Sequence, residues 1–308
     1  MSSPAVARLQ RVAIGMDFAE PSVRAASWIA DQLSGTADIL LVHAVDAPVP
    51  DDLAAPRPRP DADISRDVQA SATERLQQLA RDLPARSVEV RTDGDRPAWA
   101  ISRAADEWGA DLVVVGPHDG TNSAWERLGS TAERIVRMSA VPVLMAAAVP
   151  AHPIGSILVA VDHVDLTPAV LHWAGLVASA TGARVTLLHA LETTVRPGEV
   201  AGGHLEQGAE RKWLAALAAE LPSTANVLLE VVSGEADSVV LSAARRTAAD
   251  LIVLGRRGRG RSVPAVLGST VSRVLRRAPC PVLVVVDPQD AVLDMWDLDL
   301  ETGQQSPD

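Results

Sequence analysis

The stretch ADLIVLGRRGRGRSVPAVLGSTVSRVLRRAPCPVLVVV (residues 249–286) contains the pattern that decides the fold. Its two short apolar runs, 251–255 and 282–286, have the length and the Val, Ile and Leu content of buried strands. A glycine-rich segment follows the first run and leads into a helical pattern at 269–277. Strand, loop, helix and strand in this order predict part of a parallel sheet whose helices pack on its faces.

The same pattern occurs 139 residues earlier, as ADLVVVGPHDGTNSAWERLGSTAERIVRMSAVPVLMAA (110–147). Further matches extend this repeat toward the start of each copy: RVAIGMDFAEPSVRAASWIA with SILVAVDHVDLTPAVLHWAG, and ILLVHAV with VTLLHAL. A repeat that covers nearly the whole chain indicates two copies of one fold. We therefore expect domains at 8–148 and 154–287, followed by a disordered acidic tail at 288–308.

Each copy alternates short strands with longer helical segments. In the second copy the predicted strands are 157–161, 184–190, 226–232, 251–255 and 282–286, and the predicted helices are 167–181, 204–220, 236–248 and 269–277. The strands are almost continuously apolar, as expected where helices cover both faces of a sheet. The fold class is α/β: two repeated, doubly wound, five-stranded parallel-sheet domains. A strand order of the 2-1-3 type places the first and fourth strands side by side at a crevice.

Composition narrows the possible functions. A net charge of −11 argues against general nucleic-acid binding. The single cysteine, Cys280, fits a reducing compartment, and we expect it to be a buried core residue. The sequence begins without the apolar run of a signal peptide, and none of its apolar runs approaches the ~18 residues of a membrane helix. We expect a cytoplasmic protein that does not bind membranes.

The glycine-rich loop carries the chemistry. Gly255, Gly258 and Gly268 allow a ligand to approach the backbone closely, and free N–H groups in such a loop form a concave site for anions. Ser269 is the predicted N-cap of the following helix, whose positive end faces the same point. The loop also contains four basic residues, which add positive charge in an otherwise acidic chain: Arg256, Arg257, Arg259 and Arg261. The pattern predicts a cradle for phosphates.

These motifs resemble the universal stress protein family, and the chain resembles a tandem member with two such domains. Residues 255–269 fit the G-2x-G-9x-G-S/T motif of the ATP-binding members without a gap. The family's hydrophobic-x-Asp ending of the first strand is matched by Val159 to Asp162, and its His followed by a small residue is matched by His189 and Ala190. The resemblance implies a Rossmann-like, adenine nucleotide alpha hydrolase-like fold that binds ATP.

The resemblance also implies a role for each matching residue. The backbone around Asp162 and Ala190 would contact adenine, and Ala160 and Val161 would line that pocket. Leu254 and Gly255 would lie against the ribose. The triphosphate would be held by Gly258, Gly268, Ser269 and Thr270, with Val271 nearby. Because a carboxylate repels phosphates, Asp162 fits the ribose or base, or acts through a Mg²⁺ ion.

The first copy departs from this motif. Asp119 stands at the position of the middle glycine and adds a negative charge where a phosphate would pass. Gly120, the next residue, could replace the missing glycine if the turn of this loop shifted by one residue. We therefore predict a weaker site in the first domain, at Asp17, Ala44, Gly116, Gly129, Ser130 and Thr131, and leave open whether it binds nucleotide.

Other chemistry finds little support in the sequence. His43 and His189 end apolar strands, but no spacing predicts convergent metal ligands, so we expect packing roles and no metal site. We recognise neither a Walker A lysine nor a serine nucleophile elbow.

The leading hypothesis is a nucleotide-dependent stress-response sensor that changes a contact with an unknown protein partner. The alternatives are a slow ATPase or other nucleotide-using enzyme, and an interaction scaffold without nucleotide. The apolar last strands predict pairing of the two domains, and a homodimer is possible.

Overall fold

The computed structural model describes residues 9–45, 62–117, 130–164, 166–191, 203–256 and 267–286. Over these residues each half contains five strands and four helices. The first half consists of β1 (Arg11–Gly15), α1 (Glu20–Leu33), β2 (Asp38–Ala44), α2 (Ala62–Asp82), β3 (Ser87–Asp93), α3 (Pro97–Trp108), β4 (Leu112–Val115), α4 (Ser130–Met138) and β5 (Val143–Met145). The second half consists of β6 (Ser156–Ala160), α5 (Thr167–Thr181), β7 (Arg184–Leu191), α6 (Gly203–Ala218), β8 (Val227–Ser233), α7 (Ala236–Arg246), β9 (Leu251–Gly255), α8 (Ser269–Arg277) and β10 (Val282–Val285).

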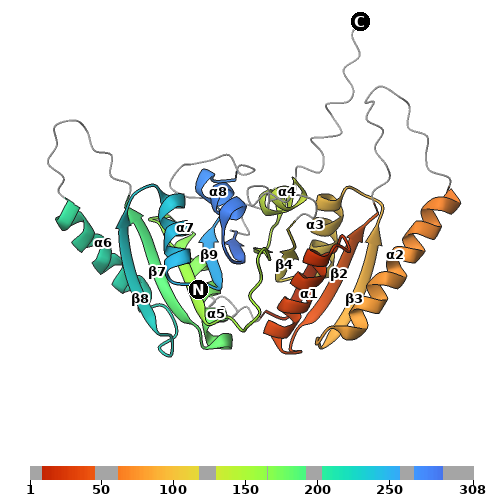
Figure 1. Cartoon of the computed structure of the whole chain (residues 1–308), viewed down its shortest axis with the longest axis horizontal. Helices are drawn as coiled ribbons and strands as arrows, with labels where there is room; N and C mark the ends of the chain where they lie inside the picture. The colour runs from red at the N-terminus through yellow and green to blue at the C-terminus, as the bar shows by residue number, and fades with distance from the viewer. Residues whose placement is uncertain are drawn as a thin grey trace, which may run out of the picture.

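All ten strands belong to one sheet, in the order β3-β2-β1-β4-β5-β10-β9-β6-β7-β8 (Figure 1). Each half therefore has the order 3-2-1-4-5, and the predicted 2-1-3 type of order is wrong. The first and fourth strands are nevertheless adjacent, as expected, because β1 pairs with β4 and β6 pairs with β9. Within each half the strands are parallel, so both switch points open at the carboxyl ends of these strands.

The last strands join the two halves. β5 and β10 pair antiparallel, with Val143 opposite Val284 and Met145 opposite Val282. All of these side chains are buried. An ion pair between Arg276 of α8 and Glu133 of α4, with 2.8 Å between Nη2 and Oε2, crosses the same boundary. Strand pairing, apolar burial and charge thus hold the halves in one continuous structure.

Helices cover both faces of the sheet. Most of the buried apolar side chains of α1, α2, α5 and α6 belong to one cluster, and most of those of α3, α4, α7 and α8 belong to another. Trp28 and Trp173 are buried in the first cluster, as expected of packing residues. Each cluster includes residues from both halves, so the core is continuous across the β5–β10 boundary.

The predicted fold class is confirmed: each half is a doubly wound, five-stranded parallel sheet. The helices at 167–181 and 269–277 have the predicted bounds, and the other elements of the second half agree within two residues. Four features of the sequence lie outside the described residues: the middle of the glycine-rich loop with Gly258, Arg257, Arg259 and Arg261; Asp119, Gly120 and Gly129 of the first copy; a Pro-rich segment at 47–60, which follows β2 in the sequence; and the acidic tail at 288–308.

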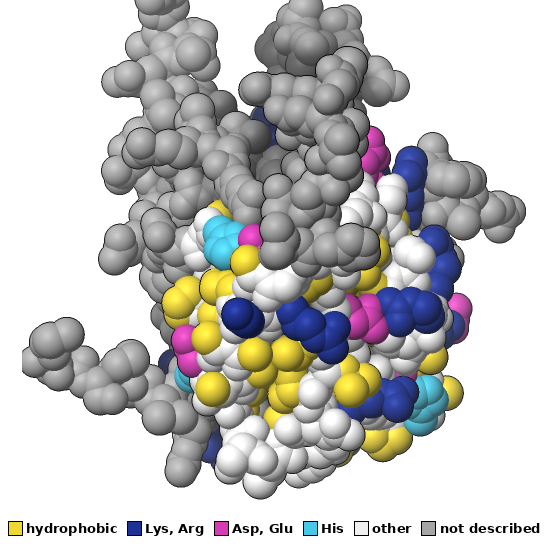
Figure 2. Space-filling view, turned by 90° about the vertical axis from the view of Figure 1, so that its left-hand side faces the viewer, with side chains coloured by type: hydrophobic (Ala, Val, Ile, Leu, Met, Phe, Trp, Pro, Cys, Tyr) yellow, Lys and Arg dark blue, Asp and Glu magenta, His cyan; other side chains and the backbone are white. Residues whose placement is uncertain are grey.

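The open edges of the sheet are β3 and β8. Leu228 of β8 is 50% exposed, and Figure 2 shows apolar side chains on this end of the molecule beside Lys and Arg. On the same strand Glu230 pairs with Arg246 of α7. Charged side chains at an edge oppose strand-to-strand association. None of the described helices is long and apolar enough to cross a bilayer.

Cys280 lies just before β10 and is 3% exposed, which confirms the expected core position. Burial, with a smaller contribution from the nearby Asp250 carboxylate, raises the pKa of the thiol from 9.0 to about 12.

We expect iodoacetamide at pH 8 to leave the native chain unmodified and to alkylate one thiol in the denatured chain, as measured by intact mass. Because the thiol ionises earlier in the unfolded chain, its contribution to stability is complete below pH 9 and is lost as the pH rises toward 12. Rapid alkylation of the native chain would contradict this account.

Candidate functional site

The predicted site lies at the carboxyl ends of β6 and β9. Ala160 pairs with Leu254 in the register of these strands, so the chain leaves the sheet toward Asp162 and through Gly255 at neighbouring points. β7 lies on the other side of β6, and its carboxyl end brings Ala190 to the same edge. The structure therefore brings together the described residues expected around adenine and ribose.

The start of α8 forms the end of the predicted site where phosphates are expected. Gly268 is the N-cap and Ser269 the first helical residue, so the prediction of Ser269 as N-cap is wrong by one position. The first bond of the helix runs from the N–H of Ser272 to the carbonyl of Gly268, 3.0 Å apart. A glycine cap has no side-chain acceptor, so the N–H groups of Ser269, Thr270 and Val271 have no partner among the described residues. Unsatisfied N–H groups at the positive end of a helix are suited to an anion.

The glycine-rich loop begins and ends at one place. The N–H of Gly268 donates to the carbonyl of Arg256 at 3.3 Å, and the N–H of Arg256 donates to Val285 of β10 at 2.8 Å. The segment that contains Gly258 is therefore anchored at both ends beside the first turn of α8.

Arg256 has a different role from the one predicted. Its side chain is 1% exposed and turns away from solvent toward the other half of the chain. Its Nη1 donates to carbonyls at the end of α4: those of Arg137 at 3.0 Å and Ser139 at 3.2 Å, with a longer contact of 3.5 Å to Val136. A guanidinium at the negative end of a helix satisfies carbonyls that have no partner within the helix. Arg256 thus joins the two halves through its guanidinium, a role that the sequence did not predict.

At the end of the predicted site where adenine is expected, short hydrogen bonds fix the backbone. The N–H of Val161 donates to the carbonyl of Leu188 at 3.0 Å, which continues the β6–β7 pairing by one residue. The Asp162 carboxylate accepts the N–H of His163 at 2.8 Å, and the Asp162 carbonyl accepts the hydroxyl of Thr167. These contacts fix the turn after β6 and leave Asp162 half-buried.

The first half has a cavity of about 510 Å³ at the corresponding edge. Five of the six residues predicted there line it: Asp17, Ala44, Gly116, Ser130 and Thr131. The sixth, Gly129, lies outside the described residues. Val68, Pro97 and Ile101 contribute apolar walls, and Val68 is 48% exposed. The cavity combines apolar walls with a helix start, as the predicted weaker site requires.

Gly116 also has a packing role that the sequence did not reveal. A Cβ at this position would lie 2.9 Å from the Cα of Ser22 in α1, which is too close for any real contact. We expect Gly116→Ala to lower the free energy of unfolding by about 1–3 kcal/mol because α1 must move. Gly208→Ala, on the exposed side of α6 where a Cβ meets open space, is expected to stabilise by about 0.5–1 kcal/mol. Urea unfolding of both variants measures whether the free energy of unfolding falls in Gly116→Ala and rises in Gly208→Ala. Equal changes in the two variants would contradict the packing role of Gly116.

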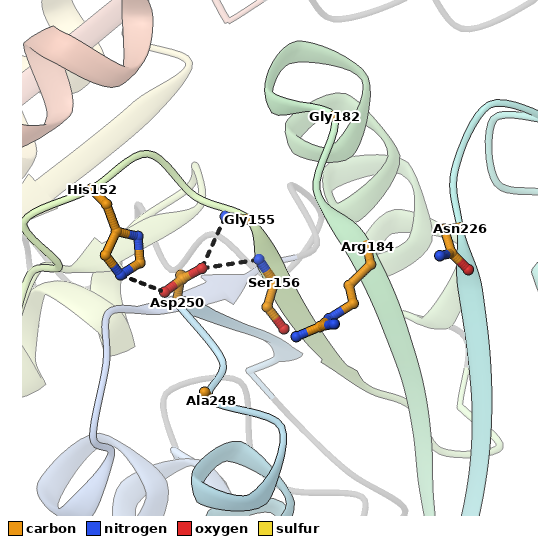
Figure 3. A pocket seen from close by; sticks show the side chains of 8 residues that line it. All are labelled: His152, Gly155, Ser156, Gly182, Arg184, Asn226, Ala248 and Asp250. Atoms are coloured by element: carbon orange, nitrogen blue, oxygen red, sulfur yellow. Dashed lines mark hydrogen bonds and ion pairs between the residues drawn. The ribbon is translucent and has the colours of Figure 1, made fainter.

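A second cavity, of about 500 Å³, lies at the opposite edge of the sheet, at the amino ends of β6 to β9 (Figure 3). There Asp250 accepts the N–H groups of Gly155 at 2.9 Å and Ser156 at 3.0 Å. In the first half Asp111 accepts the N–H groups of Gln10 and Arg11 at 2.8 Å each. Since both halves use an aspartate to hold the start of their first strand, we assign this feature to the fold and not to a ligand.

Sequence reasoning missed one group of side chains. His163, His189 and Glu210 place three ligand-type atoms within 4.8 Å of one another. The expectation that His189 has no convergent partners is therefore wrong, since its partners come from the turn after β6 and from α6. The repeat gave one signal, because His163 stands where the first copy has Phe18.

Comparison with known proteins agrees with this architecture. The model of the universal stress protein family matches residues 8–147 and 153–286. A universal stress protein from Thermus aquaticus is 34% identical over 135 residues, which cover 42% of this chain and 97% of that protein. The crystal structure of a universal stress protein from Archaeoglobus fulgidus has a TM-score of 0.68 at 22% identity and covers 90% of this chain and 98% of that one. A functionally unknown protein from Pseudomonas aeruginosa has a TM-score of 0.60 at 19% identity, over 98% of this chain and 100% of its own. At these identities the two structures establish the fold.

Proposed function

This chain belongs to the universal stress protein family, and from that premise we propose that its second half binds ATP and that the protein is a nucleotide-dependent sensor in a stress response. One observation carries the proposal. The first turn of α8 presents the N–H groups of Ser269, Thr270 and Val271 next to the end of β9, where the glycine motif begins. The spacing of Gly255, Gly258 and Gly268 matches that of the family's ATP-binding members.

The proposal assigns a set of residues to each end of the nucleotide. At the phosphate end, helix N–H groups and the hydroxyls of Ser269 and Thr270 supply donors, and Arg257, Arg259 and Arg261 add charge to the same loop. At the other end, the backbone between Val161 and Asp162 and the small side chain of Ala190 would contact a planar base. Asp162 would contact the ribose or base, or reach the phosphates through a Mg²⁺ ion.

The loop supports binding more than catalysis. Residues 255–270 contain no Asp, Glu, His, Lys or Cys. Donors for phosphate oxygens are present, but this segment has no side chain suited to act as a general base or nucleophile near neutral pH. The nucleotide would therefore stay bound intact and change a contact with another protein through the difference between loaded and empty states.

Incubation of the chain with ATP and Mg²⁺ tests this choice. The sensor predicts that nucleotide eluted from the protein after several hours is still ATP, as resolved by ion-exchange chromatography. Rapid conversion to ADP would favour an enzyme, and failure to retain nucleotide would favour a scaffold; either result would contradict the proposal. Heat-denatured protein in the same mixture is the control for spontaneous hydrolysis.

A further inference from the structure

We propose that His163, His189 and Glu210 form a binding site for a divalent transition-metal ion, with Zn²⁺ as the best-fitting ion. Two imidazole nitrogens and one carboxylate oxygen lie within 4.8 Å of one another. This set of ligands suits zinc, whereas Mg²⁺ prefers oxygen atoms alone. The site is next to the predicted adenine contacts and distinct from the phosphate loop, because its histidines are neighbours of Asp162 and Ala190 in the sequence.

The environment of His189 indicates a cation most directly. The ring is 1% exposed, and its Nδ1 lies 3.0 Å from the carbonyl oxygen of Val161. A carbonyl only accepts, so Nδ1 carries a hydrogen, and a ring with this one hydrogen has its lone pair at Nε2. That Nε2 is buried without a hydrogen-bond partner among the described residues and lies 3.8 Å from Oε2 of Glu210. A lone pair at Nε2 and the carboxylate oxygen of Glu210 would both be satisfied by a metal cation bound between them. Ligating histidines commonly donate their second N–H to a carbonyl in this way.

His163 and Glu210 complete the set. Nε2 of His163 lies 2.6 Å from Oε2 of Glu210. The ring of His163 stacks on Trp213 at a centroid distance of 3.8 Å, and Trp213 meets the ring of His189 edge-on at 5.2 Å. A tetrahedral zinc ion with bonds of ~2.0–2.1 Å needs ligand atoms ~3.3 Å apart. The observed separations of 2.6 and 3.8 Å lie on either side of this value. Because the side chain of His163 is 38% exposed, it has room to adjust and an ion has a path to enter.

The first half shows the same scaffold without the ligands. There Nδ1 of His43 contacts the carbonyl oxygen of Met16 at 2.7 Å, as His189 does with Val161. Phe18 replaces His163 and packs on His43 with a centroid distance of 4.5 Å. The guanidinium of Arg75 lies 4.0 Å from the centre of the Phe18 ring. An apolar ring and a cation in these places oppose metal binding, so the metal ligands distinguish the second half from the first.

Equilibrium dialysis of the full chain against Zn²⁺ tests the site, after EDTA has removed bound metal and exhaustive dialysis, checked by ultraviolet absorbance, has removed bound nucleotide. We expect one tightly held Zn²⁺ per chain. His163→Phe, which introduces the residue of the first half, and Glu210→Gln are each expected to lower the affinity by at least about 10–100-fold. His152→Gln, at the opposite edge of the sheet, is the matched control and should leave the affinity unchanged. Because His163 is exposed, its variant is expected to fold, which circular dichroism verifies.

Co²⁺ in place of Zn²⁺ provides a second measurement, since tetrahedral coordination gives strong visible absorption that His163→Phe should remove. Zinc uptake that is absent, or that is equal in wild type and His163→Phe, would overturn the proposal. A loss of uptake in His152→Gln alone would also overturn it, since it would assign the ion to the other edge. Because no nucleotide is present, failure here leaves the proposal of ATP binding unaffected, and failure of ATP binding leaves this one intact.

Discussion

Gly258→Asp is expected to weaken ATP binding by about 100-fold or more. Two like charges 4 Å apart repel by about 4 kcal/mol at an effective dielectric constant of 20, and each 1.4 kcal/mol corresponds to a factor of ten in affinity. The variant introduces into the second half the residue that the first half already has, Asp119. Isothermal titration calorimetry with ATP measures the effect.

Two further variants separate the causes. Gly258→Ala adds the Cβ without the charge and should lose less affinity than Gly258→Asp. Gly120→Asp adds the same charge to the loop of the first half and should leave affinity unchanged if the second half holds the nucleotide. Wild-type affinity in Gly258→Asp would show that the glycine motif does not contact phosphate.

Arg256→Met is expected to lower the free energy of unfolding by about 3 kcal/mol or more, because each buried carbonyl left without a donor costs ~1–3 kcal/mol. The guanidinium joins β9 to the end of α4 across the boundary between the halves. Methionine fills a similar volume but donates no hydrogen bond, so the loss is mainly that of the polar contacts. Urea unfolding monitored by tryptophan fluorescence measures it.

Arg245→Met on the exposed side of α7 is the matched control and is expected to change stability little. Arg256→Lys keeps the charge with a single nitrogen and should give an intermediate loss. If Arg256→Met and Arg245→Met had the same unfolding midpoint, the role of Arg256 between the halves would be wrong.

The bounds of the helices and strands were predictable from the sequence, because they depend on residues that are close together in the chain. Short apolar runs and helical spacing located α5 and α8 with their observed bounds. The sequence repeat matched the first strand of one half with the first strand of the other, and the fourth strand with the fourth. The full strand order was not predictable in this way, because the position of β3 and β8 at the edges depends on contacts between segments that are far apart in the chain.

The incorrect site predictions also have physical causes. An arginine in a glycine-rich loop has the same local signature whether it faces a phosphate or, like Arg256, carbonyls about 120 residues away in the chain. The partners of His189 come from a turn and a helix 26 and 21 residues away, at spacings that match no metal motif. The N-cap is Gly268 and not Ser269, because the backbone is still extended at Gly268, with ψ of 142°, and is already helical at Ser269.

The nucleotide content of the purified chain tests the central claim most directly. Protein isolated without added nucleotide is denatured, and the released supernatant is separated by ion-exchange chromatography and quantified by absorbance. We expect about one ATP per wild-type chain and none from Gly258→Asp. Wild-type protein that carries no nucleotide and also takes up none from added ATP would contradict the account.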